Sequence, residues 1–158
     1  MLAKGLTSPQ PHLYKLLLQM KTILTTAILM VLAGSLSAEP LNMDKLIPAL
    51  KQVESQNNAN AIGDNGKAKG ILQIWQVVVD DVNRVSKVKY THDDAFDPVK
   101  AEAICRKYLA IYCTAKRLGH EPTMEDASRI WNGGPIGHKK SATNSYWKRV
   151  AKALVDKA

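Results

Sequence analysis

Hydrophobic residues recur at helical spacing along most of residues 44–155. The first such stretch, capped by Asn42 or Asp44, predicts an amphipathic helix with apolar positions at Leu46, Ile47, Leu50 and Val53. We expect this helix to end at Glu54, which continues the same helical spacing. An acid is therefore expected on the apolar side of the helix, where it would be poorly hydrated.

The next stretch is polar and rich in turn-forming residues. Asp64, Asn65 and Gly66 form a D-N-G sequence, which predicts a tight hairpin turn between two short segments. Residues 70–74 (GILQI) are mainly apolar. We expect a short buried strand to begin near Ile71 in this segment, with Gln73 as its polar side chain.

Two further helices are predicted after this segment. Residues 75–85 are apolar with a few charges and predict one helix, and Asp97 followed by Pro98 predicts the start of another. Gly119 is expected to end this long helix after Leu118. Its expected buried stripe consists of Ala101, Ile104, Cys105, Tyr108, Ile111, Tyr112, Ala115 and Leu118.

The remaining residues complete a mainly α pattern. Thr123 and Asp126 resemble a capping box and predict a short helix to about residue 130, followed by a loop over residues 131–137 (WNGGPIG). Residues 146–155 predict a closing helix. Because residues 39–158 contain no internal repeat or linker, we predict one mainly α (α+β) domain with a small β-hairpin.

Residues 20–38 (MKTILTTAILMVLAGSLSA) differ in pattern from the rest of the chain. One lysine precedes an uncharged apolar run, which small residues follow, and this order is typical of a secretory signal peptide. The run from Ile23 to Leu36 is about 14 residues long, whereas a membrane-spanning helix needs about 20. A cleaved signal is therefore favoured over a permanent anchor.

The predicted domain organisation follows from this segment. Residues 1–38 are expected to be an N-terminal extension and signal peptide, with the start at Met20 and cleavage near Ser37 or Ala38. Residues 39–158 would form the folded domain, secreted or periplasmic. The alternative is an uncleaved segment that anchors this domain to a membrane.

The net charge of the chain indicates which kinds of partner the domain would bind. The chain carries 22 basic and 14 acidic side chains, a formal charge of +8, and loss of residues 1–38 would remove three lysines and no acid, leaving +5. Such a domain is attracted to anionic polymers, including bacterial cell walls. No nucleic-acid-binding motif is present, so nucleic acid is not an expected partner. Contact with a membrane is expected only through an uncleaved signal segment.

The cysteines and histidines predict neither a metal site nor a cofactor. The four histidines are scattered, and the two cysteines lack C-x-x-C spacing. Cys105 and Cys113 fall in the predicted long helix, where they would be separated by about 12 Å along the axis. That separation exceeds the limit of about 7 Å for a disulfide, so two buried thiols are expected.

Glu54 and Asp64 are the candidates for chemistry. Two carboxyl groups in unlike surroundings can cleave a glycosidic bond, one as proton donor and the other as nucleophile or stabiliser of the oxocarbenium ion. Desolvation of Glu54 would favour its neutral form, which suits an acid near neutral pH. Asp64 lies in a polar turn, where it would stay ionised. On pattern alone, an exposed helix-end glutamate and a turn-forming aspartate are the more ordinary interpretation.

Two groups of motifs resemble a known family. The E-S pair at Glu54 and Ser55, an N-x-x-A-I segment, a glycine-bounded turn and G-x-x-Q-I at residues 70–74 resemble lysozyme-like peptidoglycan hydrolases, including lytic transglycosylases. Residues 125–150 contain E-D, R-I, N-G-G-P, A-T and Y-W in the order of the invertebrate-type (destabilase) lysozyme signature. The resemblance covers most of residues 44–150, although Trp131 and Ala127 replace residues usual in the invertebrate type.

The resemblance implies a lysozyme-like fold with the hairpin beside the active-site cleft. It places the catalytic acid on Glu54 and the second carboxylate on Asp64, and implies that Ser55 supports the acid by hydrogen bonding. The sugar-binding residues that it implies, besides Ser55, are Gln73, Trp131, Asn132, Gly133 and Tyr146. No metal or cofactor is implied.

The implied activity is that of an exported muramidase. Such an enzyme is a glycoside hydrolase that cleaves the β-1,4 bonds between N-acetylmuramic acid and N-acetylglucosamine in peptidoglycan glycan strands. Glu54 would be the general acid and base, and Asp64 the nucleophile or stabiliser. The alternatives are a lytic transglycosylase that uses Glu54 alone and forms 1,6-anhydro products, a non-catalytic peptidoglycan-binding module, and activity on chitin.

Overall fold

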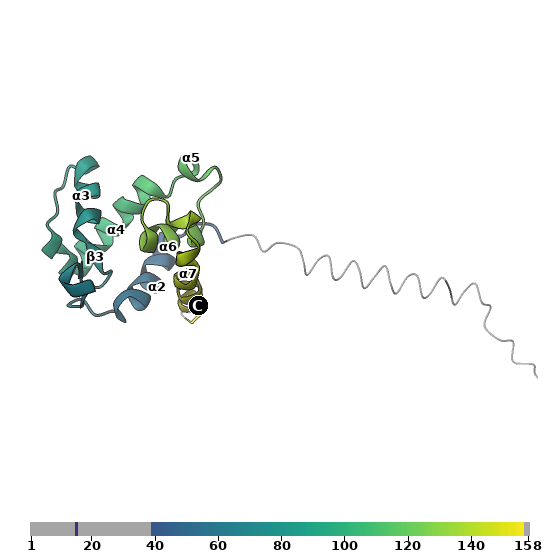
Figure 1. Ribbon diagram of the computed structural model, residues 1–158, viewed down its shortest axis with the longest axis horizontal. Coiled ribbons are helices and arrows are strands. Elements are labelled where there is room, and N and C mark those ends of the chain that lie inside the picture. Colours follow the sequence, from purple (N-terminus) through teal and green to yellow (C-terminus); the bar gives the residue numbers. More distant parts are fainter. Residues whose placement is uncertain (1–14, 16–38, 157–158) are drawn as a thin grey trace, which may run out of the picture. The chain divides into compact units, whose positions relative to one another are not determined.

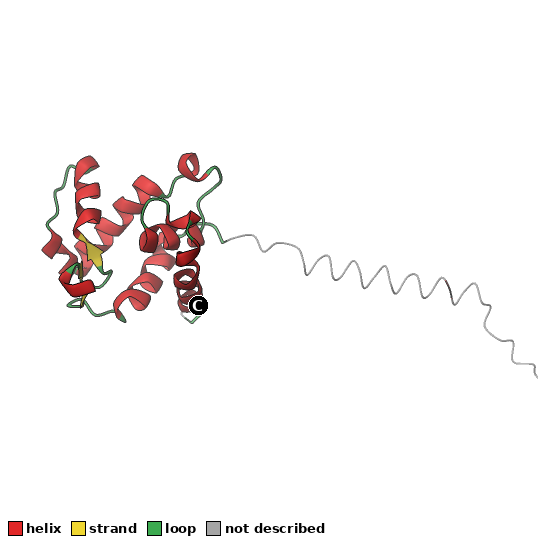
Figure 2. Cartoon of the chain, in the orientation of Figure 1, coloured by secondary structure: helices red, strands yellow, loops and turns green. Residues whose placement is uncertain are grey.

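The computed structural model describes Lys15 and residues 39–156. The predicted signal peptide, its start and its cleavage site therefore lie outside the described residues. Residues 39–156 are mainly helical with one small sheet, which confirms the predicted mainly α class (Figures 1 and 2). None of the helices in these described ranges is long and apolar enough to cross a membrane.

The helix that carries Glu54 is α2 (Met43–Ser55). It begins as predicted, because the Asn42 side chain accepts hydrogen bonds from the backbone N–H groups of Asp44 and Lys45 at 3.0 and 3.2 Å. The helix ends at Gln56, whose left-handed backbone (φ 55°) turns the chain away. Its buried face consists of Leu46, Ile47, Ala49 and Leu50.

A three-stranded antiparallel sheet follows α2. Its strands have two residues each and are paired in the order β1 (Ile62–Gly63), β2 (Ala68–Lys69) and β3 (Ile74–Trp75). The short 3-10 turn η1 (Asp64–Gly66) joins β1 to β2, which confirms the predicted D-N-G hairpin. The third strand pairs with the second, Lys69 opposite Ile74.

The segment between β2 and β3 corrects one prediction. Gly70 to Gln73 form a turn, so the strand expected near Ile71 begins only at Ile74. Gly70 (φ 72°) and Gln73 (φ 49°) adopt left-handed conformations, which an extended strand cannot contain. Ile71 and Leu72 are buried as expected, because the turn folds them into the core.

The predicted long helix is wrong as a single element. It is divided into α4 (Pro98–Tyr112) and α5 (Ala115–Leu118). Asp97 caps α4 as expected, accepting from the Val99 and Lys100 N–H groups at 2.8 and 3.2 Å. The chain becomes extended at Thr114, whose hydroxyl accepts from the Arg117 N–H and starts a new helix. Gly119 (φ 82°) ends α5, as predicted.

The two cysteines are free and buried. Cys105 lies on the buried face of α4, and Cys113 is the residue that ends this helix. Burial raises the pKa of both thiols, that of Cys113 to about 12. They therefore act as packing residues rather than as reactive groups.

The last helices are α6 (Met124–Gly133) and α7 (Asn144–Val155). The Thr123–Asp126 capping box is confirmed, and so is the closing helix. The loop predicted from Trp131 is wrong at its start, because α6 continues through Trp131, Asn132 and Gly133. The helix ends at Gly134, whose φ of 81° favours glycine.

The core forms where α4 meets the other elements. Helix α4 packs against α3 (Gln76–Val85) on one side and α6 on the other, and α2 and α6 both pack against α7 (Figure 1). Tyr112 at the end of α4 donates a hydrogen bond to the buried Asp81 carboxylate on α3 at 2.7 Å. The largest fully buried side chains include Leu46, Leu50, Leu72, Ile104, Leu109, Met124 and Ile130.

Gly70 generates a stability prediction. A Cβ at this position would lie 1.7 Å from the Ala95 carbonyl oxygen, whereas one at Gly119 would meet nothing within 4 Å. Both glycines have positive φ, so the comparison isolates the steric contact. Gly119→Ala should cost about 1 kcal/mol, and Gly70→Ala about 1–3 kcal/mol more. Urea unfolding of the two variants measures the difference. Equal midpoints would contradict the close approach of the two backbones.

Candidate active site

The candidate site is organised around a carboxyl–phenol pair. Glu54 is half-buried in the last turn of α2, and Tyr146 is buried in the first turn of α7. The Tyr146 hydroxyl donates a hydrogen bond to Glu54 Oε1 at 2.7 Å. The pair joins two segments that are 92 residues apart in the sequence. It therefore depends on the packing of α2 against α7.

Burial raises the pKa of Glu54 to about 7. Removing the carboxylate from water is the largest cause, and the hydrogen bond from Tyr146 is the largest opposing effect. The positive charge of Arg149 and the side chain of Trp131 also lower this pKa, and the negative charge of Asp64 raises it slightly. The expected desolvation of Glu54 is thus confirmed. At neutral pH the carboxyl group can both donate and accept a proton.

Tyr146 is a permanent hydrogen-bond donor to this carboxyl group. Burial and the neighbouring charge of Glu54 raise the pKa of the phenol well above its usual value. The Arg149 guanidinium lies over the phenol ring, 5.4 Å from its centroid. The phenol therefore remains protonated throughout the range in which Glu54 titrates.

Trp131 supports the pair from α6. Its side chain is only 9% exposed and packs edge-on against Tyr108 of α4, with ring centroids 5.8 Å apart. Helix α6 contacts both α2 and α4, and the side chain of Trp131 is close enough to Glu54 to lower its pKa. The extension of α6 beyond residue 130 is what carries Trp131 to this position.

Asp64 occupies a different environment from Glu54. It is exposed in η1 with a left-handed backbone (φ 48°). Its carboxylate makes no side-chain hydrogen bond or ion pair with any other residue that the structure describes. Its charge nevertheless contributes to the pKa of Glu54, so the hairpin lies within electrostatic reach of the acid.

Ser55 has another role than the one expected. Its hydroxyl donates to the Ile71 carbonyl oxygen at 2.8 Å, and the Lys51 carbonyl lies further away at 3.4 Å. It therefore ties the turn over residues 70–73 to the end of α2 instead of bonding to Glu54. The expected hydrogen bond to the acid is wrong because the helical backbone directs Ser55 toward Ile71.

Gln73 also acts within the small sheet. Its Nε2 donates to the Gly70 carbonyl oxygen at 3.0 Å, which closes the turn. Its Oε1 lies against Gly63, where a Cβ would be only 2.2 Å away. Gln73 thus lies against Gly63, the residue that precedes Asp64 in the chain.

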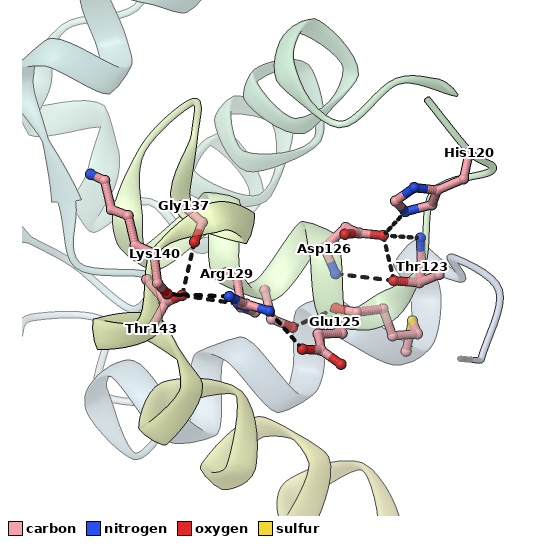
Figure 3. Close-up of polar contacts among 10 residues, drawn as sticks. His120, Thr123, Glu125, Asp126, Arg129, Gly137, Lys140 and Thr143 are labelled. Atoms are coloured by element: carbon pink, nitrogen blue, oxygen red, sulfur yellow. Dashed lines mark hydrogen bonds and ion pairs between the residues drawn. The ribbon is translucent and has the colours of Figure 1, made fainter. Parts of the chain in front are cut away.

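The segment from Gly133 to Thr143 is tied to α6 by Arg129 (Figure 3). Arg129 donates to Thr143 Oγ1 at 3.0 Å, to Glu125 Oε1 at 2.8 Å and to the Lys140 carbonyl oxygen at 3.2 Å. The Lys140 ammonium donates to the Gly133 carbonyl oxygen at 2.6 Å. These contacts position the start of α7, and with it Tyr146. Asn132 is exposed at the end of α6.

Arg149 is the site residue that sequence reasoning missed. It lies three residues after Tyr146, so it falls on the same face of α7. Arg149 is the second residue after the Y-W pair of the invertebrate-type signature. Its position in this motif was the feature of the sequence that could have indicated a role in the site. The described residues contain no group of three His, Cys, Asp or Glu side chains that could hold a metal ion.

The fold and this carboxyl site define a lysozyme-like protein. The family model of the transglycosylase SLT domain matches residues 34–153, and the chain belongs to this family. Its lysozyme-like fold confirms the fold expected from the motifs. Membership supports a lysozyme-like activity on peptidoglycan.

A solved structure gives a further similarity. The chain is similar to a chain in the crystal structure of Aeromonas hydrophila PliI in complex with Meretrix lusoria lysozyme, with 27% identity and a TM-score of 0.58. The match covers 68% of this chain and 87% of that one. The search of curated proteins found no significant match.

Glu54→Gln should change the pH dependence of stability. Because the folded-state pKa of about 7 exceeds the ordinary 4.5, the folded protein binds more protons between these values. The contribution of Glu54 to stability is thus fully present below about pH 4.5 and is lost as pH rises through 7. Glutamine mimics the neutral acid, so the variant should be more stable by about 2–3 kcal/mol at pH 8 and equal to wild type at pH 4.

Urea unfolding of wild type and Glu54→Gln at both pH values measures this difference. Glu121→Gln is the matched control, because it removes an exposed carboxyl group elsewhere. A constant difference between pH 4 and pH 8 for Glu54→Gln would show that the carboxyl group is not desolvated.

Tyr146→Phe should raise the pKa of Glu54 above that of the wild type. The phenol hydrogen bond stabilises the carboxylate form, and its loss leaves the desolvation less opposed. Carbon-detected NMR titration of the Glu54 carboxyl group measures the shift. Tyr112→Phe removes a hydroxyl group bonded to Asp81 instead, so it should leave the titration unchanged. A lower pKa in Tyr146→Phe would contradict the assigned direction of the hydrogen bond.

Proposed function

We propose that this protein is a lytic transglycosylase that cleaves the β-1,4 bond between N-acetylmuramic acid and N-acetylglucosamine in peptidoglycan, with Glu54 as its single acid and base. The observation that carries the proposal is that the side chain hydrogen-bonded to Glu54 is the Tyr146 phenol and not a second carboxyl group. Glu54 is desolvated and hydrogen-bonded to Tyr146, whereas Asp64 is exposed in a hairpin turn. Membership of the transglycosylase SLT domain family supports the same choice.

One carboxyl group with a pKa near 7 is sufficient for both halves of this reaction. Protonated Glu54 gives its proton to the glycosidic oxygen, the bond from C1 of N-acetylmuramic acid breaks, and N-acetylglucosamine leaves as an alcohol. The resulting carboxylate then removes the proton of the C6 hydroxyl group of the same sugar. The C6 oxygen attacks C1, which forms the 1,6-anhydro ring and restores protonated Glu54. Water is neither consumed nor released.

Tyr146 keeps Glu54 suitable for both roles. Burial alone would favour the neutral acid, and the phenol hydrogen bond stabilises the carboxylate that exists between the two steps. Because the phenol stays protonated, it can remain a donor through the whole cycle. Tyr146 is therefore a positioning residue for Glu54.

The second candidate is a muramidase, the hydrolase implied by the motifs. The effect of Asp64 on the pKa of Glu54 favours it, because it places the second carboxylate within electrostatic reach of the acid. In this mechanism Asp64 would stabilise or capture C1, and water would complete the reaction. The resemblance of residues 125–150 to the invertebrate-type lysozyme signature also supports the muramidase.

The proposed setting of either activity is outside the cytoplasmic membrane. The signal-like pattern of residues 20–38 supports a secreted or periplasmic protein, where the peptidoglycan substrate lies. The positive net charge supports attraction to an anionic wall polymer.

Two variants and the masses of the products test the proposal. Glu54→Gln should lose at least about 100-fold in the rate of muropeptide release while its fold is retained. Asp64→Asn should keep activity within about threefold, because the single-acid reaction does not use Asp64. Mass spectrometry should find 1,6-anhydro ends, which are one water lighter than hydrated ends.

The control for Glu54→Gln is again Glu121→Gln, which should be fully active. Hydrated ends together with an inactive Asp64→Asn variant would assign the muramidase instead. Retention of peptidoglycan by the wild type without release of any fragment would identify a binding module and overturn both enzymatic candidates.

A further inference from the structure

A pocket of about 360 Å³ lies between the end of α2, the helix that carries Glu54, and the second half of α7. Its lining residues are Gln52, Val53, Arg149, Lys152, Ala153 and Asp156. Gln52 and Val53 immediately precede Glu54 in α2, and Arg149 lies over the ring of Tyr146. Arg149 therefore links the pocket to the candidate acid, because its charge also acts on Glu54.

Arg149 and Lys152, the α7 cation pair, give this pocket its charge. They follow Tyr146 at three-residue steps, so the three side chains lie along neighbouring turns of one helix face. Both cations are exposed. Within residues 39–156, neither forms an ion pair or a side-chain hydrogen bond, and this includes Asp156, the one acid in the lining. Two cations against one acid leave the lining of the pocket positive.

The substrate carries the complementary group. Each N-acetylmuramic acid of peptidoglycan bears a stem peptide on its lactyl group, and stem peptides carry free carboxylates. A sugar ring placed for protonation by Glu54 brings that peptide close to the adjoining end of α7. Arginine and lysine bind carboxylates by charge-assisted hydrogen bonds, and arginine can do so through two parallel bonds. Chitin has the same glycosidic bond and no such group.

We infer that the pocket formed by Gln52, Val53, Arg149 and Lys152 binds a carboxylate of the stem peptide and selects peptide-bearing peptidoglycan over uncharged glycans. This inference rests on the proposed function, because it takes Glu54 as the point of cleavage. It adds a specificity site on α7 that is separate from the acid. Arg149 lies over Tyr146 in the candidate active site and also lines the pocket, whereas Lys152 lines only the pocket.

The test compares soluble peptidoglycan strands with the same strands after their carboxylates have been converted to carboxamides. The wild type should cleave the native strands about three- to tenfold faster, the range expected for exposed ion pairs. Lys152→Gln should reduce this preference, and Arg149→Gln with Lys152→Gln should abolish it. The double variant should therefore cleave native and amidated strands at equal rates, whatever the effect of Arg149→Gln on Glu54.

Lys116→Gln is the matched control, since it removes an exposed lysine of α5 that does not line the pocket. It should keep the wild-type preference. Arg149 also affects Glu54, so binding is measured in the Glu54→Gln background, where no carboxyl group titrates at position 54. There, native strands should bind more tightly than amidated strands, and the two pocket substitutions should remove the difference.

Three results would overturn the inference. They are equal cleavage of native and amidated strands by the wild type, an equal loss on both substrates in Lys152→Gln, and a preference that survives the double variant. A wild type that binds native strands through the α7 cation pair but cleaves neither substrate would overturn the proposed activity and leave the binding site in place.

Discussion

The burial of one carboxyl group against one phenol is the constraint on which the site depends. Desolvation of Glu54 raises its pKa, and the hydrogen bond from Tyr146 limits this rise. Neither effect alone would give a pKa near 7. Burial without the donor would keep the acid protonated, and a donor without burial would keep it ionised. The two effects act together only when α2 and α7 are held in contact.

The supporting elements each fix one part of that contact. Helix α6 carries Trp131 to the acid and is itself fixed to α4 by the edge-on packing of Trp131 against Tyr108. Arg129 fixes the start of α7 by binding both the side chain of Thr143 and the Lys140 carbonyl oxygen. Ser55 fixes the other end of the site by tying the turn at Ile71 to α2. The turn between β2 and β3 is thus attached to the acid-bearing helix by a hydrogen bond from the Ser55 side chain to a backbone carbonyl group.

The sequence predicted those features that depend on local chemistry. Asn42, Asp97 and the Thr123–Asp126 box cap helices as expected, and D-N-G forms the hairpin. The acid on an apolar face was likewise predictable, because periodicity alone places Glu54 there. Features that depend on competition between local and long-range contacts were not. The Thr114 cap divides a helix whose apolar stripe is continuous, and packing against Tyr108 extends α6 through residues that favour a loop.

The partner of Glu54 shows where sequence reasoning ends. Two carboxyl groups ten residues apart suggested a pair within one loop, but the side chain that the acid contacts is Tyr146, from the other end of the domain. Tyr146 was expected among the sugar-binding residues, and its hydrogen bond to the acid follows only from the antiparallel packing of two helices. Because the pKa of Tyr146 is raised, its hydroxyl group stays protonated and acts here as a hydrogen-bond donor to the acid. The contact that defines the site is therefore consistent with the proposed chemistry, in which one carboxyl group gives a proton to the leaving oxygen and then takes another from the substrate hydroxyl group that attacks C1.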